Sequence, residues 1–137
     1  MSEDQRLELN KDPKYQEMQN EYGNILRAKG FCWLADEDSL IIGFAQSGRI
    51  VSFQAVMPWY TVLKEEQWGV VEGSKDYKVI RSKFQEPFGD RRQELVFIGI
   101  DLKIDNIQKA LDACLLTGKD LEQYKKKNED ENKAQKM

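Results

Sequence analysis

The chain has 137 residues, of which 21 are Lys or Arg and 24 are Asp or Glu, so its formal net charge is −3. This length fits one domain with its own core, and the acidic balance disfavours a nucleic-acid binder that neutralises phosphates. Histidine is absent, which excludes Ser-His-Asp and Cys-His catalytic sites as well as HExxH zinc sites.

The two cysteines, Cys32 and Cys114, lie far apart, each alone in an apolar stretch. This pattern predicts reduced, buried thiols rather than a disulfide scaffold or a zinc site, and we expect no metal and no cofactor. The first ten residues carry no apolar signal-peptide core, and no apolar run approaches the roughly 20 residues of a membrane span. We therefore expect a soluble, cytoplasmic protein without a membrane span.

A helix is predicted from Pro13 to Leu26, after a short edge strand at Arg6–Leu9. Asp12 is placed to cap this helix, and Pro13 fits the first helical position, where its missing N–H would be unpaired anyway. The apolar residues of the helix recur at spacings of three and four, which predicts one face packed on a sheet. They are Tyr15, Met18, Tyr22, Ile25 and Leu26.

Three strands of an antiparallel meander are predicted next, at Gly30–Ala35, Leu40–Ala45 and Arg49–Val56. Asp36–Asp38 forms a polar loop before the second of them. Gly48 supplies the left-handed position that a three-residue hairpin loop requires.

The segment Met57–Gly73 has no regular pattern but contains three large rings, so we expect a long surface loop or a short helix pinned by aromatic side chains. These rings are Trp59, Tyr60 and Trp68. Ser74 is predicted to cap a second helix, which ends at Pro87 and Gly89.

Gln93–Ile100 is the most apolar stretch, and it predicts a strand in the middle of the sheet, buried on both faces. A third helix is predicted from Asp105, with Gln108 in the capping-box position, to a C-cap at Gly118. Its inner face is expected to consist of Ile107, Leu111, Cys114 and Leu115. The order of elements predicts an α+β fold, an antiparallel-rich sheet of four to five strands with helices packed on one face.

We divide the chain into a polar segment 1–11, an α+β domain 12–118 and a charged tail 119–137. The tail is low in complexity and nearly neutral, with Lys125–Lys127 followed by Glu129–Glu131. This composition favours a solvated helical or disordered extension over a binding patch.

No catalytic constellation is found. A P-loop requires a glycine, four further residues and then Gly-Lys-Ser/Thr. Gly118-Lys119 is followed by Asp120, and Ala113 stands where the first glycine is required. The adjacent carboxylates of this chain lie in polar loops, which indicates solvent-facing side chains rather than an acid/base pair in a dry cleft.

Pro87–Gly99 is the most distinctive segment. A Gly-Asp turn precedes Arg91, Arg92 and Glu94, whose side chains are placed to form bidentate ion pairs where an apolar strand begins. Two interpretations are open: an Arg–carboxylate network that clamps a loop to the sheet edge, or a docking surface.

Four blocks, in order over residues 12–118, resemble the C-terminal domain of CobW-type metallochaperone GTPases. They are Arg27–Phe31 with Trp33–Ala35, Pro58-Trp59 with Trp68, GDRRQELVFIG at 89–99, and Ala110–Thr117. The family includes cobalamin-biosynthesis CobW proteins, zinc-regulated chaperones and nitrile hydratase activators. The resemblance implies the fold of this domain, without the P-loop GTPase domain and Cys-rich metal motif that full-length members carry.

In such proteins the domain adjoins the GTPase domain, and the resemblance implies that it regulates this domain and recognises clients. The matched residues are therefore candidates for partner binding. They are Arg27, Lys29, Trp59, Trp68, Asp90, Arg91, Arg92, Gln93 and Glu94. A structural role stays open for each: ion pairs for Arg27 and Lys29, and core or loop packing for the tryptophans.

We therefore expect a non-catalytic protein-interaction or regulatory module whose partner is a separate CobW-type GTPase or a metalloprotein client. The alternative is a structural accessory subunit of a larger assembly. A single-stranded nucleic-acid binder is disfavoured by the net charge and by the absence of RNP1 glycines in Arg92–Phe97. An enzyme is not expected.

Overall fold

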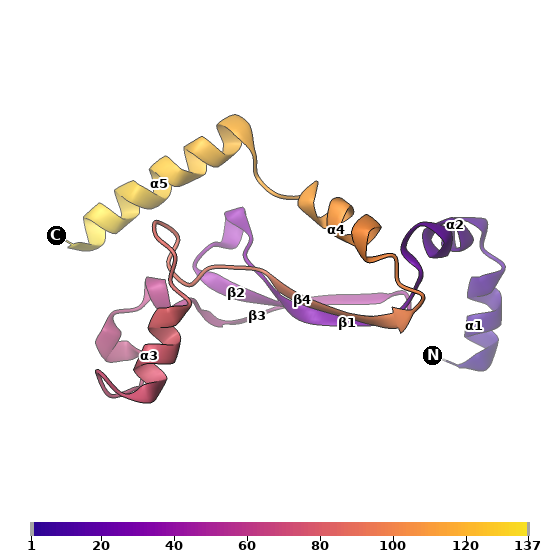
Figure 1. Ribbon diagram of the computed structural model, residues 1–137, viewed down its shortest axis with the longest axis horizontal. Coiled ribbons are helices and arrows are strands. Elements are labelled where there is room, and N and C mark those ends of the chain that lie inside the picture. Colours follow the sequence, from indigo (N-terminus) through magenta and orange to yellow (C-terminus); the bar gives the residue numbers. More distant parts are fainter. Residues whose placement is uncertain (1, 137) are drawn as a thin grey trace. The chain divides into compact units, whose positions relative to one another are not determined.

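The computed structural model of the protein describes residues 2–136. Its helices are α1 (Glu3–Asn10), α2 (Pro13–Tyr22), α3 (Lys75–Ser82), α4 (Ile104–Asp112) and α5 (Gly118–Lys136). Its strands are β1 (Asn24–Cys32), β2 (Leu40–Ser47), β3 (Ile50–Pro58) and β4 (Glu94–Ile100). The strands, which are labelled in Figure 1, form one antiparallel sheet in the order β3-β2-β1-β4, and this confirms the predicted α+β class.

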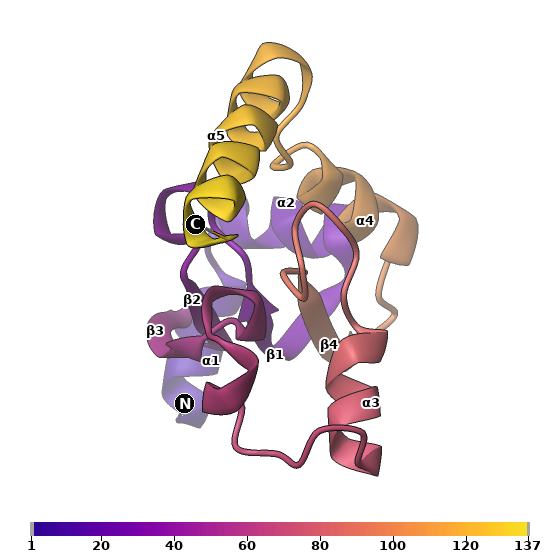
Figure 2. The same ribbon diagram turned by 90° about the vertical axis from the view of Figure 1, so that its left-hand side faces the viewer.

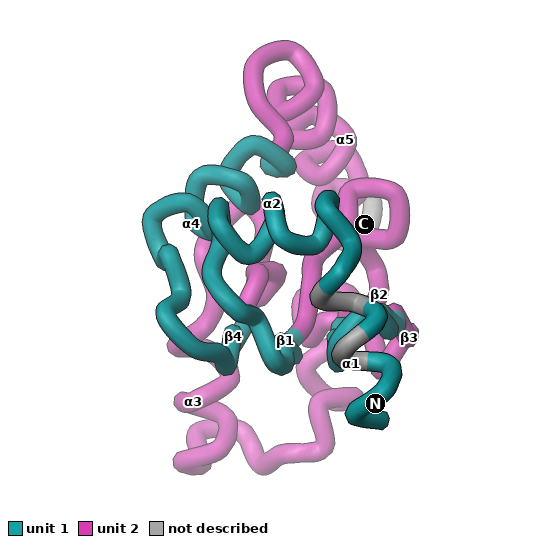
Figure 3. The backbone as a smooth tube through the Cα atoms, turned by 90° about the vertical axis from the view of Figure 1, so that its right-hand side faces the viewer, with its two compact units in different colours: residues 1–30, 44–52, 95–115 teal, residues 31–43, 53–94, 116–137 magenta. Residues whose placement is uncertain are grey.

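The chain forms two compact units, which are coloured separately in Figure 3. Unit 1 comprises residues 1–30, 44–52 and 95–115, and includes α1, α2 and α4. Unit 2 comprises residues 31–43, 53–94 and 116–137, and includes α3 and α5. The division by sequence into 1–11, 12–118 and 119–137 stays a prediction.

Both N-terminal helices begin at capping residues. As predicted, the Asp12 side chain accepts a hydrogen bond from the N–H two residues on, at 3.0 Å, and Pro13 begins α2. The edge strand predicted at Arg6–Leu9 is wrong, because these residues belong to α1. A capping box explains this helix, since the Ser2 N–H donates to Gln5 Oε1 at 2.9 Å and the Gln5 N–H donates to Ser2 Oγ at 3.2 Å.

α2 ends at Tyr22 rather than at Leu26. Gly23 has a φ of 87°, a conformation that glycine adopts without strain, and a Cβ at this position would lie 2.4 Å from the carbonyl oxygen of Asp101. The chain therefore leaves the helix at Gly23 and continues as β1. β1 therefore begins at Asn24, before the strand predicted at Gly30–Ala35, and it includes residues that were predicted to be helical.

β2 and β3 form the predicted hairpin, but a two-residue turn joins them. Gly48, with a φ of 60°, and Arg49 make this turn, in place of the predicted three-residue loop. β2 therefore runs two residues beyond the predicted Leu40–Ala45, and β3 ends beyond the predicted Arg49–Val56.

β4 lies at the edge of the sheet, next to β1, so the prediction of a central strand buried on both faces is wrong. Leu95 and Phe97 are half-buried, whereas the alternate residues Val96, Ile98 and Ile100 are each more than half exposed. An apolar run does not by itself distinguish a strand with two covered faces from a strand with one exposed face.

α4 packs against α2 within unit 1, where the two helices lie side by side (Figure 2). The Lys103 N–H, just before α4, donates to the Tyr22 carbonyl oxygen at 3.0 Å. The Asn106 side chain donates to the Glu21 carbonyl oxygen at 2.7 Å. α4 thus fastens the C-terminal end of α2 and buries Ile107, as predicted for this side chain.

The third predicted helix is shorter than expected. α4 ends at Asp112, and Gly118, predicted as its C-cap, instead begins α5. Cys114 and Leu115 follow α4 and are exposed, so the buried thiol predicted for Cys114 is wrong. Cys32 is half-buried, and both cysteines are free.

Aromatic side chains form most of the core of unit 2. Trp59 and Trp68 are 1% and 8% exposed, and they anchor a segment with two short 3-10 helices, Tyr60–Val62 and Glu65–Gln67. The prediction of an irregular segment pinned by its rings is therefore confirmed. Ser74 caps α3 as predicted, through its side-chain oxygen.

Candidate protein-interaction surface

Two cavities identify the two faces of the sheet within unit 1. Successive strand residues point to opposite faces, and one set of alternate residues lines a cavity together with Tyr15, Met18 and Tyr22 of α2. This set is Ala28, Phe44, Gln46, Val51 and Phe97. The intervening residues line a second cavity, which Ala28 and Gln46 also border. We name this second set the open face: Arg27, Lys29, Ala45, Ser47, Ile50, Ser52 and Ile98.

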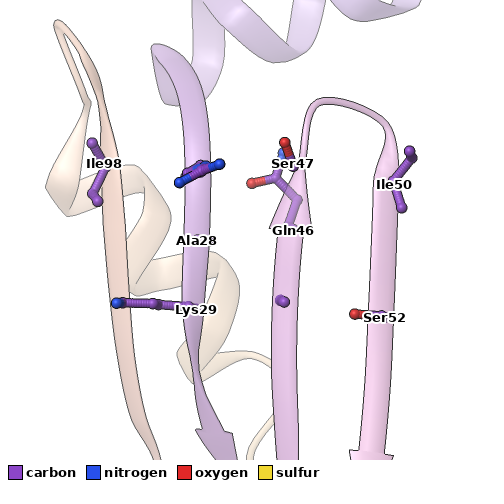
Figure 4. Close-up of a pocket in the computed structure, with 9 residues that line it drawn as sticks. Ala28, Lys29, Gln46, Ser47, Ile50, Ser52 and Ile98 are labelled. Carbon is purple, nitrogen blue, oxygen red and sulfur yellow. The ribbon is translucent and has the colours of Figure 1, made fainter. Parts of the chain in front are cut away.

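Only strand residues line the cavity of the open face. Figure 4 shows its labelled side chains on four neighbouring strands, with Ile98 on β4, Lys29 on β1, Ser47 on β2 and Ile50 on β3. Every member of the set is exposed, and Ile50 and Ile98 are 75% and 51% exposed. These two isoleucines lie on the two edge strands of the sheet, with β1 and β2 between them.

Arg27 and Lys29 carry the charge of the open face. Both side chains are exposed on β1, and within the described residues 2–136 the structure gives neither of them an ion-pair partner. The segments 24–30, 44–52 and 95–100, which supply the strands of unit 1, contain no Asp or Glu. Two positive charges therefore lie among isoleucines and small residues with no carboxylate on those strands.

In unit 2, the loop Pro87–Glu94 engages its charged side chains internally. Asp90 is 3% exposed, and its carboxylate accepts hydrogen bonds from the N–H groups of Tyr60 at 3.0 Å and Thr61 at 2.9 Å. Gly89 has a φ of 72°, and a Cβ there would lie 2.3 Å from the Thr61 side chain. The Gly-Asp pair is thus required by the close approach of a neighbouring segment of the same unit.

The two arginines of this loop also have internal partners. Arg91 donates through Nε to the Asp38 carbonyl oxygen at 2.7 Å. Arg92 donates through Nε to Glu94 Oε1 at 3.1 Å and through Nη1 to the carbonyl oxygen two residues before it, at 2.9 Å. Its guanidinium also lies 5.1 Å from the ring centre of Phe31. These contacts agree with the structural interpretation, a clamp made of arginine side chains.

Gln93 pairs with Trp33, which directly follows β1, as a backbone group would. Its side-chain amide accepts from the Trp33 N–H at 2.8 Å and donates to the Trp33 carbonyl oxygen at 3.0 Å. Three of the nine predicted partner-binding residues are buried, Trp59, Trp68 and Asp90, and the other six are half-buried or exposed. Partner binding by these nine residues stays a prediction.

Two residues of α5 bond to the Pro87–Glu94 loop or to its partners, and sequence reasoning did not single them out. Tyr124 is 7% exposed, and its hydroxyl donates to Asp38 Oδ2 at 3.0 Å and accepts from the Trp33 Nε1–H at 2.9 Å. Asn128 is 2% exposed and, with its amide oxygen facing Arg91, accepts from Nη1 at 2.8 Å. The available signal was a spacing of three and four in a polar helix, at Leu121, Tyr124, Asn128 and Asn132.

Burial and hydrogen bonding shift the pKa values of several side chains. Burial raises the pKa of Tyr124 to about 12, because the phenolate would lose its hydration. Burial likewise raises the pKa of the Cys32 thiol. The hydrogen bond from Arg49 is the main reason that the pKa of Asp12 is lowered. Tyr124 is therefore neutral at physiological pH and remains a hydrogen-bond donor to Asp38.

Within the described residues, no three Cys, Asp or Glu side chains converge in the manner of a metal site. The helices of residues 2–136 include none with the length and apolar content to cross a membrane.

A comparison with known families identifies the family of the chain. Residues 6–115 match the family described as "Cobalamin synthesis protein cobW C-terminal domain". The chain therefore belongs to the CobW C-terminal domain family. The matched region includes the four strands and α2 to α4, whereas α5 lies beyond it.

The chain is also similar to Zinc-regulated GTPase metalloprotein activator 1 of Dictyostelium discoideum, at 37% identity over 101 residues. This match covers 73% of the chain but 21% of the relative, so the chain spans about a fifth of that protein's length. No solved structure matches the chain. The likeness therefore concerns a C-terminal domain, and it does not transfer the activity of the whole relative.

Proposed function

We propose that this chain is a non-catalytic interaction module that acts in the cytoplasm with a partner protein, either a separate GTPase or a metalloprotein client. The observation that carries the proposal is the open face, where two cations of β1 without ion-pair partners among the described residues lie between exposed isoleucines of the two edge strands. Exposed apolar side chains and charged groups that a partner must satisfy are both features of protein interfaces.

The family supports the choice of partner. The relative is named as a GTPase and a metalloprotein activator, and the present sequence contains no P-loop pattern. Where the partner is a GTPase, the partner therefore hydrolyses the GTP. The chain contributes binding surface, and Arg27 and Lys29 contact the partner directly.

The residues of the Pro87–Glu94 loop have a different part in the proposal. Arg92, Gln93 and Glu94 are only partly covered, so they offer a second contact area. Trp59, Trp68 and Asp90 act indirectly, because they hold that loop and the 3-10 segment in place. Arg91 has both roles: its bond to Asp38 supports the loop, and its half-buried side chain is still partly accessible to a partner.

A structural accessory subunit of a larger assembly is the second candidate, and α5 favours it. This helix lies beyond the matched residues 6–115, has one side buried at Tyr124 and Asn128, and carries charged residues on its exposed side. An added helix of this kind enlarges the surface that a domain presents to neighbouring subunits. In that case the open face would contact a permanent neighbour.

The two candidates are separated by isolating the full chain with an affinity tag from its native cells under mild conditions. We expect a complex well above the 16.0 kDa of the chain, containing a protein that hydrolyses GTP or binds a metal. A large assembly without GTPase activity would support the accessory subunit. Isolation of the chain alone, or GTP hydrolysis by the purified chain, would contradict the proposed function.

A further inference from the structure

The open face has the dimensions of a side-chain binding surface. Its cavity has a volume of about 330 Å³, which is at the lower end of the roughly 300–1,000 Å³ typical of small-molecule pockets. Four strands supply its walls, and no loop or helix residue lines it (Figure 4). Such a shallow surface fits a few side chains of a protein segment better than it fits an enclosed cofactor.

Within the described residues, no salt bridge engages the two cations of this surface. A neighbouring cavity shares Ser47 and Ile50 with the open face and is lined by the carboxylates of Asp4, Glu8 and Asp12. Glu8 pairs with Lys11, and within the described residues none of these carboxylates forms a salt bridge with Arg27 or Lys29. Arg49 already pairs with Asp12, so this carboxylate is engaged at the hairpin turn. Arg27 and Lys29 therefore remain the cations that a docking partner must satisfy.

Covering these two cations with an apolar partner would be unfavourable. A buried Lys or Arg without a carboxylate loses its hydration and gains nothing in return. Covering them with a purely polar acidic partner would leave Ile50 and Ile98 against charged groups. The surface is therefore complementary to a segment that carries both carboxylates and apolar side chains.

We propose that the open face binds an acidic, apolar segment of another protein, whose carboxylates pair with Arg27 and Lys29 while its apolar side chains cover Ile50 and Ile98. This inference rests on the proposed function, because it specifies the chemistry of the partner at that same surface. The segment crosses the strands, since its contacts come from β1, β3 and β4.

A second copy of this chain is a poor occupant. The strands of unit 1 contain no Asp or Glu, and a two-fold dimer through the open face would bring the same surface of both copies together. The charged members of the open face in each copy would be Arg27 and Lys29, and like charges across an interface are unfavourable.

Single-stranded nucleic acid is also a poor occupant. Proteins that bind it combine a cationic groove with aromatic rings on which bases stack. None of the residues lining the open face is aromatic, and the net charge of the chain is −3. The isoleucines offer no comparable stacking surface, so a protein segment is the occupant that the chemistry favours.

The occupant can be identified by photo-crosslinking in native cells. The full chain is prepared with benzoylphenylalanine in place of Ser52, which lies on the open face, and in a separate variant in place of Gln93, which lies in the Pro87–Glu94 loop. We expect the Ser52 probe to crosslink to a segment of another protein that contains Asp or Glu together with apolar residues. Crosslinks to nucleic acid, to a second copy, or to a segment without acidic residues would each overturn the proposal.

Charge reversal then tests the pairing itself. The double variant Arg27→Glu/Lys29→Glu is expected to bind the crosslinked protein about tenfold more weakly or worse. Replacing the carboxylates of the partner segment with lysine should restore binding to this variant and weaken binding to the unchanged chain. The double variant Lys126→Glu/Lys133→Glu reverses the same number of charges at exposed residues of α5, so it is the matched control and is expected to bind normally. Unchanged affinity of the Arg27→Glu/Lys29→Glu variant would refute the pairing.

The failure of this inference differs from the failure of the proposed function. If the chain travels with a partner that crosslinks from Gln93 but not from Ser52, the open face is not the docking site and the interaction module remains. If neither probe crosslinks to another protein and the chain is isolated alone, both the inference and the proposed function are wrong.

Discussion

The Pro87–Glu94 loop of unit 2 and the open face of unit 1 both present cations, but these cations differ in what surrounds them. Arg91 and Arg92 donate to protein oxygen atoms at 2.7 to 3.1 Å, whereas Arg27 and Lys29 have no ion-pair partner within the described residues. A cation with internal acceptors stabilises its own loop, and a cation without them is available to another molecule. An Arg-rich block in a sequence is therefore not by itself an interface.

The largest effect on this comparison is expected from Asp90→Ala. Its removal leaves the buried N–H groups of Tyr60 and Thr61 without acceptors, and we expect the free energy of unfolding to fall by about 3 kcal/mol. Urea denaturation measures this loss. Asp36→Ala, at an exposed carboxylate, is the control and should change the free energy by less than about 0.5 kcal/mol. Equal effects of the two substitutions would show that the loop is not held by its internal bonds.

Tyr124→Phe tests whether α5 belongs to the same internal network. Loss of the hydroxyl removes its hydrogen bond to Asp38 and leaves the Trp33 Nε1–H without its acceptor. We expect the free energy of unfolding to fall by about 1.5 kcal/mol at neutral pH. A change indistinguishable from zero would mean that α5 is not fixed to unit 2 in solution.

The same residue predicts a pH dependence. The pKa of Tyr124 is about 12 in the folded chain and about 10 in the unfolded chain, so the unfolded chain loses this proton first as the pH rises. The stabilisation due to Tyr124 is therefore complete below pH 10 and declines as the pH rises toward 12. Urea denaturation across this range should show the difference between the wild type and Tyr124→Phe shrinking. A constant difference would contradict the raised pKa.

A smaller effect is expected from exchanging arginine for lysine in the two regions. Arg92→Lys loses the planar guanidinium that bonds to Glu94 and lies over Phe31, and we expect a loss of about 1 kcal/mol in the free energy of unfolding. Arg27→Lys should cost less than about 0.5 kcal/mol, since within residues 2–136 the Arg27 side chain has no ion pair to lose. Thermal or urea denaturation of both variants measures these losses. A larger loss in the free energy of unfolding for Arg27→Lys than for Arg92→Lys would contradict this prediction.

The smallest effect on stability is expected from Arg27→Glu/Lys29→Glu. These exposed side chains have no ion pair to lose within the described residues, so the free energy of unfolding should change by about 0.5 kcal/mol or less. The same variant should nevertheless lose its partner. Urea denaturation and recovery of the complex, measured on one preparation, check both statements. A large loss of stability would show that the two cations support the fold rather than the interaction.

Local signals in the sequence predicted much of the fold. The caps at Asp12 and Ser74, the hairpin around Gly48 and the ring-pinned segment between Trp59 and Trp68 all depend on residues close together in the chain. Helix α1 was missed although its capping-box residues are also local. The error at this helix was one of interpretation rather than of missing information.

The candidate site was predictable in part. Family resemblance drew attention to Arg27 and Lys29 and to the Asp90–Glu94 block, but it did not separate cations that are satisfied internally from cations that are not. That distinction depends on contacts such as Arg91 with Asp38, which are far apart in sequence.

The sequence by itself determined the fold class, the family and the absence of a P-loop pattern and of histidine chemistry, because these follow from local pattern and residue identity. Only the tertiary structure decided that β4 is an edge strand with one exposed apolar face, and that Tyr124 and Asn128 of a polar helix are buried. The physical reason is that exposure depends on which segments cover a residue. The same apolar run can lie beneath a helix or face solvent, and nothing in its own sequence distinguishes the two.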